Sequence, residues 1–105
     1  MDDNSVISKR LREARLAAGI SQKRLGIAAG IDEFSASPRM NQYERGKHIP
    51  DFSTVERLAT ILNVPTPYFY TRDEGLAKLL LQYGRLGTDS KEKLLRIALD
   101  IESKS

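Results

Sequence analysis

Apolar residues recur along most of this chain at the spacing of an α-helix, whereas the alternation typical of half-buried strands is almost absent. The first apolar stripe consists of Ile7, Leu11, Ala14 and Ala18. Gly19 is placed to end that helix, and Ser21 is a good N-cap for a second one, which Gly30 can stop. The predicted buried residues of this second helix are Leu25, Ala28 and Ala29. The chain therefore begins with two helices joined by a tight turn.

The middle of the chain predicts a loop and then a third helix. Residues 31–37 read as a loop, and Ser37 followed by Pro38 is a helix-start signal, because the missing N–H of proline is harmless in a first turn. Met40 and Tyr43 are expected to face the core, so Tyr43 is interpreted as packing rather than as a stacking platform. Gly46 ends this helix.

The remaining helices complete an all-α prediction. A fourth helix, Phe52 to Leu62, has an apolar stripe and either Asp51 or Ser53 as its cap; the stripe is Val55, Leu58, Ala59 and Leu62. After Pro65, residues 68–70 predict one aromatic turn that closes the core. Two more helices are predicted at about 73–83 and 90–102. The last is apolar around most of its circumference and needs more than one surface to bury it. We therefore expect one domain over residues 1–70 and a helical segment over residues 71–105.

The basic charge of the chain lies entirely in its first half. Residues 1–50 carry nine Lys/Arg against six Asp/Glu, whereas residues 51–105 carry eight of each, and the net charge is +3. Such an excess is a weak pointer to a polyanionic partner. The acidic start, residues 1–4, is not expected to be a secretory signal, and no apolar run reaches the roughly 20 residues that cross a bilayer. With no cysteine, the composition suits the cytoplasm.

Residue patterns for catalysis or metal binding are missing from the sequence. There is no glycine-rich phosphate cradle, no His/Cys cluster and no suggestive carboxylate pair, so we expect neither an enzyme nor a metal or other cofactor. The single histidine, His48, stands beside Lys47 in a basic loop and is interpreted as solvated or phosphate-facing.

The order of helix, tight connection and helix over residues 21–45 suits recognition of double-stranded DNA. A helix in the major groove needs a bracing helix behind it and long polar side chains in front. The side chains predicted to read bases are Ser37, Arg39, Asn41 and Gln42. Arginine pairs with guanine, and glutamine or asparagine with adenine, through two hydrogen bonds each. The alternative is an ordinary helical hairpin with a solvated polar face.

These segments resemble the phage-repressor family of transcriptional regulators, the Cro/CI-like or XRE-type helix-turn-helix. The similarity covers about residues 6–70; it includes Leu11-Arg12-Glu13-Ala14-Arg15, Gly19-Ile20-Ser21-Gln22, Leu25, Tyr43-Glu44-Arg45-Gly46-Lys47, Pro50, Leu58-Ala59 and Leu62-Asn63-Val64. The resemblance implies a five-helix lambda-repressor-like domain. It also implies that Gln22 touches a phosphate and supports the reading helix, and that Arg15 pairs with Glu44. The phosphate contacts expected on this basis are Ser21, Gln22, Lys23, Arg45, Lys47 and His48.

One departure from the family pattern lies between Gly30 and Tyr43, where this sequence has four additional residues, 32–35. We expect them to lengthen the turn over residues 31–37, with Phe34 either tucked under it or exposed. The carboxylates of Asp32 and Glu33 are expected to point away from DNA, because they would repel phosphates.

Together these features predict a repressor that binds a near-palindromic operator as a homodimer. The competing interpretation is an antitoxin or an adaptor whose C-terminal helices, residues 73–103, hold a partner protein.

Overall fold

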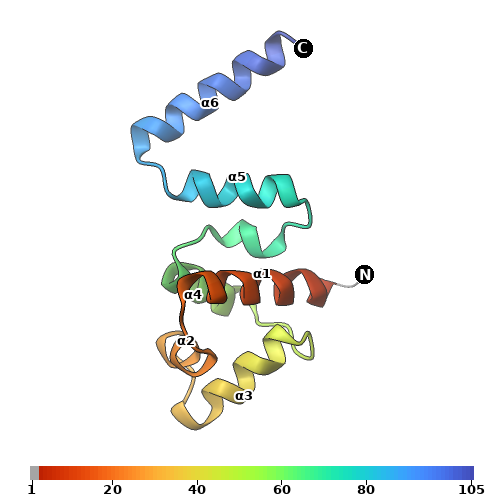
Figure 1. The fold of residues 1–105 in the computed structure, drawn as a ribbon, viewed down its shortest axis with the longest axis vertical. Helices are drawn as coiled ribbons and strands as arrows, with labels where there is room; N and C mark the ends of the chain where they lie inside the picture. Colours follow the sequence, from red (N-terminus) through yellow and green to blue (C-terminus); the bar gives the residue numbers. More distant parts are fainter. Residues whose placement is uncertain (1–2) are drawn as a thin grey trace.

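The computed structural model describes the backbone of residues 3–105 and the side chains of residues 6–105. Within this range the regular elements are helices joined by turns and short loops, and no strand occurs. The elements are α1 (Asp3–Ala18), α2 (Gln22–Ala28), α3 (Glu33–Glu44), α4 (Phe52–Leu62), a 3-10 helix η1 (Thr66–Tyr70), α5 (Glu74–Gly84) and α6 (Thr88–Ser103). The predicted all-α fold class is confirmed. In Figure 1, α1 to α4 and η1 gather into one body, α5 lies beside η1, and α6 extends away from it.

The core is built from the inward stripes of the first four helices and from η1. Leu11, Leu25, Met40, Leu58 and Phe69 are almost completely inaccessible to solvent. The stripe predicted for α4 is buried as expected, and the cap of that helix is Asp51, whose carboxylate accepts a hydrogen bond from the N–H of Thr54. The cap of α2 is Ser21, as predicted.

Three residues expected in the core lie elsewhere. Ala18, the last residue of the first predicted stripe, is exposed at the C-terminal end of α1. Ala28 was predicted to be buried but is exposed, because it faces a shallow groove between α2 and α4 rather than the core. Of the aromatic turn, Tyr68 and Phe69 are buried, whereas Tyr70 is exposed and stacks on Phe52 with ring centroids 6.4 Å apart.

The predicted start of the third helix is wrong by one turn. α3 begins at Glu33, and Asp32 caps it by accepting a hydrogen bond from the N–H of Phe34 at 3.1 Å. Residues 33–37 are therefore helical, and Pro38 lies inside the helix. Because proline has no N–H, the carbonyl of Phe34 lacks its usual donor four residues on. The additional residues lengthen the helix at its N-terminus instead of bulging from a turn.

A buried arginine fastens α5 to α1. The side chain of Arg10 is only 2% exposed; its Nε donates to the carbonyl of Thr71 at 2.9 Å, and its Nη1 contacts the carboxylate of Glu74 at 3.2 Å. The same guanidinium lies 5.5 Å from the centre of the Tyr68 ring. A buried charge needs such partners, so these contacts hold the start of α5 firmly against the first helix.

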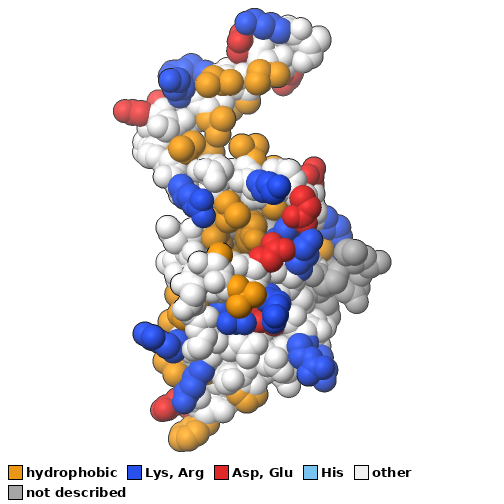
Figure 2. Space-filling view, in the orientation of Figure 1, with side chains coloured by type: hydrophobic (Ala, Val, Ile, Leu, Met, Phe, Trp, Pro, Cys, Tyr) orange, Lys and Arg blue, Asp and Glu red, His pale blue; other side chains and the backbone are white. Residues whose placement is uncertain are grey.

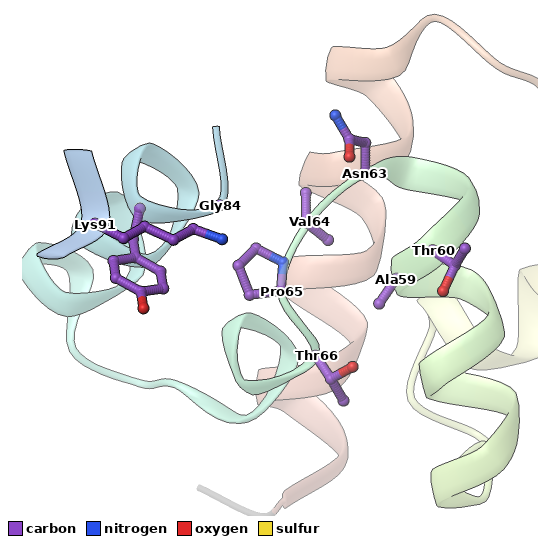
Figure 3. Close-up of a pocket in the computed structure, with 9 residues that line it drawn as sticks. Ala59, Thr60, Asn63, Val64, Pro65, Thr66, Gly84 and Lys91 are labelled. Carbon is purple, nitrogen blue, oxygen red and sulfur yellow. The ribbon is translucent and has the colours of Figure 1, made fainter. Parts of the chain in front are cut away.

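The other end of α5 approaches the domain at Pro65. A Cβ atom on Gly84 would lie 2.9 Å from the Cγ of Pro65, so only glycine allows this contact. Beside it is a cleft of about 380 Å³ that is bordered by Asn63, Tyr83 and Lys91 (Figure 3). α5 also contributes the buried Ala77 to the core cluster, whereas α6 contributes no buried residue. Among the described helices, none is long and apolar enough to cross a membrane.

Candidate nucleic-acid interface

Helices α2 and α3 cross at very short range, and a glycine allows it. Gly26 is buried, and a Cβ atom there would lie 2.9 Å from the Cβ of Ala36 and 3.0 Å from the Cγ of Met40. Both of those residues are on α3 and are fully buried. The crossing therefore leaves no room for a larger residue at position 26, and it sets the position of α3 relative to α2. Gly26 was not among the residues predicted to matter, although a glycine inside a predicted helix is the signal that could have identified it.

A nearly buried ion pair joins α1 to the end of α3. The Nε and Nη2 atoms of Arg15 donate to the two carboxylate oxygens of Glu44 at 2.5 and 3.0 Å, and Arg15 also donates to the carbonyl of Ile20 at 3.0 Å. The Glu44 side chain is 2% exposed and that of Arg15 is 11% exposed. Two parallel hydrogen bonds to a planar guanidinium give a defined orientation as well as attraction.

Gln22 at the start of α2 completes this network. Its Nε2 donates to Glu44 at 3.2 Å and to the side-chain oxygen of Asn41 at 3.5 Å. The first residue of α2 therefore supports the C-terminal half of α3.

The outward face of α3 lies opposite its three core residues, Ala36, Met40 and Tyr43. Residues at spacings of four, seven, eight and eleven share one side of a helix. That outward stripe is Phe34, Pro38, Asn41, Gln42 and Arg45. Among the predicted base-reading residues, Asn41 and Gln42 lie on it and are half-buried, whereas the exposed Ser37 and Arg39 flank it on opposite sides.

The residues expected to contact phosphates gather at the two ends of this arrangement. Ser21, Gln22 and Lys23 lie at the start of α2, and Ser21 and Lys23 are exposed. Past α3, Gly46 adopts a φ of +76°, and the N–H of Lys47 donates to the carbonyl of Gln42 at 2.9 Å. This left-handed turn positions the exposed Lys47 and His48 just beyond the helix. In Figure 2, Lys and Arg side chains lie on both flanks of the lower part of the molecule.

Comparison with known proteins places this arrangement in a family. A family model described as a helix-turn-helix domain matches residues 7–67, more than half of the chain. The chain belongs to the XRE-type helix-turn-helix family of DNA-binding transcriptional regulators. The matched residues include both α2 and α3.

Several relatives of this helix-turn-helix protein are regulators. It is 35% identical over 68 residues to the HTH-type transcriptional regulator ImmR of Bacillus subtilis, which covers 65% of this chain and 50% of that protein. It is 31% identical over 64 residues to an uncharacterized HTH-type transcriptional regulator of Sinorhizobium medicae, covering 61% of this chain and 43% of the other. The chain thus spans half or less of the length of these two relatives.

The fold also matches a solved structure along nearly its whole length. The crystal structure of the transcriptional regulator BswR is similar with a TM-score of 0.83 and 47% identity, covering 89% of this chain and 92% of that one. The shared region therefore includes residues beyond the helix-turn-helix domain.

Within the described part of the helix-turn-helix protein, no group of three or more His, Cys, Asp or Glu residues is placed to hold a metal ion.

The positions of two further residues could not be predicted from the sequence. Arg10 stands between Lys9 and Leu11 with no signal in the sequence that separates it from a surface arginine. The exposure of Phe34 could not be predicted because the predicted start of α3 is wrong.

Proposed function

We propose that this protein is a sequence-specific transcriptional repressor that binds double-stranded DNA as a homodimer and acts by occupying a near-palindromic operator in the cytoplasm. The observation that carries the proposal is the uncovered outward face of α3, braced from behind by α2 and by the Arg15–Glu44 pair. Figure 1 places α3 at one end of the molecule and α6 at the other, so the final helices do not cover that face.

The base-reading role is proposed for Arg39, Asn41 and Gln42, with Ser37 at the edge of the same surface. Phosphate contacts from Gln22, Arg45 and Lys47, helped by Ser21, Lys23 and His48, would set the register of the protein on the duplex. The positive end of α2 favours a phosphate near Gln22. The variety of these polar groups suits the mixed donor and acceptor edges of base pairs.

Support for a dimer comes from α6. Its side chains Leu95, Ile97, Leu99 and Ile101 are all exposed in the single chain. An apolar helix surface of this kind is rarely left in water and marks an interaction site. A twofold dimer would present its two reading helices to successive major-groove faces roughly 34 Å apart.

The experiment is selection of bound duplexes from a random library, followed by affinity measurements over a range of salt concentrations. Gln42→Ala should lose about 1–3 kcal/mol on the selected duplex and little on random DNA. Lys47→Ala should weaken binding to both alike and reduce the salt slope by about one. Equal losses on both duplexes for Gln42→Ala would remove it from the base-reading set. No binding to any duplex at low salt would refute the proposal as a whole.

Light scattering on the same preparations tests the dimer. We expect twice the monomer mass for the wild type. The double variant Leu95→Asp, Leu99→Asp should be a monomer that binds the operator more weakly. The melting temperature of its helix-turn-helix domain should be unchanged. The exposed face of α6 also favours a second candidate, an antitoxin or adaptor that holds a partner protein. A monomeric wild type that co-purifies with one stoichiometric protein would favour that candidate over the homodimer.

A further inference from the structure

The N-terminal turn of α3 carries a phenylalanine that is almost entirely in solvent. Phe34 is 88% exposed, whereas the next most exposed large hydrophobic residue in the described part of the chain, Ile101, is 62% exposed. Single apolar residues on a surface need no special explanation. Phe34 differs because it lies on the outward stripe of α3, in line with Pro38, Asn41 and Gln42.

From this placement we infer that Phe34 is a specificity-determining residue that contacts thymine methyl groups in the major groove. The inference rests on the proposed function, because it requires that α3 enters the groove. In helix-turn-helix complexes the N-terminal residues of the second helix approach the base edges. α3 begins at Glu33, so Phe34 lies in its first turn, at the leading end of the helix.

The chemistry of this end selects thymine. A phenyl ring can neither donate nor accept a conventional hydrogen bond, and the C5-methyl group of thymine is the apolar feature of base pairs in the major groove. No lysine or arginine occurs between Arg24 and Arg39, so this turn supplies no cation to attract a phosphate. The neighbouring carboxylate of Asp32 is held at the helix start by its hydrogen bond to the N–H of Phe34. Burial of the ring against methyl groups is thus the favourable contact that Phe34 itself can make.

Exposure also makes Phe34 easy to test, since truncating it removes little buried surface. Phe34→Ala should melt like the wild type. On a duplex selected by the wild type from random sequences, it should bind about tenfold or more weakly, as expected when a buried phenyl ring is lost. Phe52→Ala is the matched control, because Phe52 is also an exposed phenylalanine, at 59%, but lies on α4 against Tyr70. The affinity of the Phe52→Ala variant for DNA should equal that of the wild type.

The decisive measurement combines protein and base changes. Each thymine of the selected duplex is replaced in turn by deoxyuridine, which removes only the C5-methyl group. At one or two positions in each half-site, the wild type should lose about fourfold per methyl, and Phe34→Ala should lose nothing further at those positions. This coupling, and not the loss of affinity alone, identifies the contact.

The other outcomes overturn the inference and can be told apart. If Phe34→Ala weakens binding but no deoxyuridine position couples to it, the ring acts as a wedge between base steps or in another way. If Phe34→Ala changes the oligomeric mass and leaves DNA affinity intact, the ring belongs to an interface between protein copies. Unchanged affinity and unchanged mass would mean that it contacts neither. In all three cases the wild type still binds its selected duplex, whereas failure of the proposed function would abolish binding itself.

Discussion

Replacing Arg15 by methionine tests how far α3 depends on the ion pair behind it. Methionine keeps much of the length and helix propensity of arginine but removes the charge. The carboxylate of Glu44 would then stay nearly buried, with Gln22 at 3.2 Å and the exposed Arg12, 4.0 Å away, as its remaining partners. Breaking a buried pair by removing one member costs about 3–5 kcal/mol, and the remaining partners place this case near 3 kcal/mol.

The expected loss is large for a chain of this size. Domains are stable by roughly 5–15 kcal/mol in total, so about 3 kcal/mol is a substantial fraction. It corresponds to a fall in melting temperature of roughly 10–25 °C. Urea unfolding followed by far-UV circular dichroism gives the free energy of unfolding directly, provided that the slope m is the same for wild type and variant.

A double-mutant cycle separates the pair from other effects of the substitution. Glu44→Leu alone leaves the guanidinium of Arg15 with the carbonyl of Ile20, and the double variant removes both charges. Because apolar replacement of a whole buried pair is often neutral, the double variant should be more stable than Arg15→Met. If the two single losses add within about 0.5 kcal/mol, or if Arg15→Met costs less than about 1 kcal/mol, the carboxylate is not buried in the way described and the reasoning is refuted.

Two further predictions concern the packing of α3 and the attachment of α5. Gly26→Ala gains about 1 kcal/mol of helix propensity but forces a Cβ to within 2.9 Å of Ala36, so we expect a net loss of about 1 kcal/mol in the free energy of unfolding and weaker DNA binding. Stability equal to that of the wild type would show that the α2–α3 crossing can widen freely. The hydrogen bond from Lys9, followed in size of effect by the one from Arg10, lowers the pKa of Glu74 from 4.5 to about 2. A lowered pKa contributes stability above pH 4.5 that is lost as the pH falls toward 2, so the melting-temperature difference between wild type and Glu74→Gln should shrink over that interval. A difference that stays constant with pH would contradict the role of the Lys9 and Arg10 contacts.

The helices with strong apolar periodicity could be predicted from the sequence because their signals are local. The α4 stripe and the Ser21 cap each depend on residues within one or two turns of each other. Such patterns hold in any tertiary setting that offers one burying surface. The same locality explains the error at α3, where Ser37-Pro38 and Asp32 were both reasonable start signals. The helix begins at the earlier one because Ala36 packs against Gly26, a contact between residues ten apart that no local pattern displays.

By itself, the sequence determined that this is an all-helical chain with a DNA-recognition motif, since periodicity, caps and spaced family residues are properties of short segments. Only the tertiary structure decided which polar residues are partners and which face outward. Arg10 and Arg39 look alike in the sequence, yet one is buried against Thr71 and Glu74 and the other is exposed beside the outward face of α3. The physical reason is that the burial of a long charged side chain depends on acceptors brought from distant parts of the chain, and these exist only once the helices have packed.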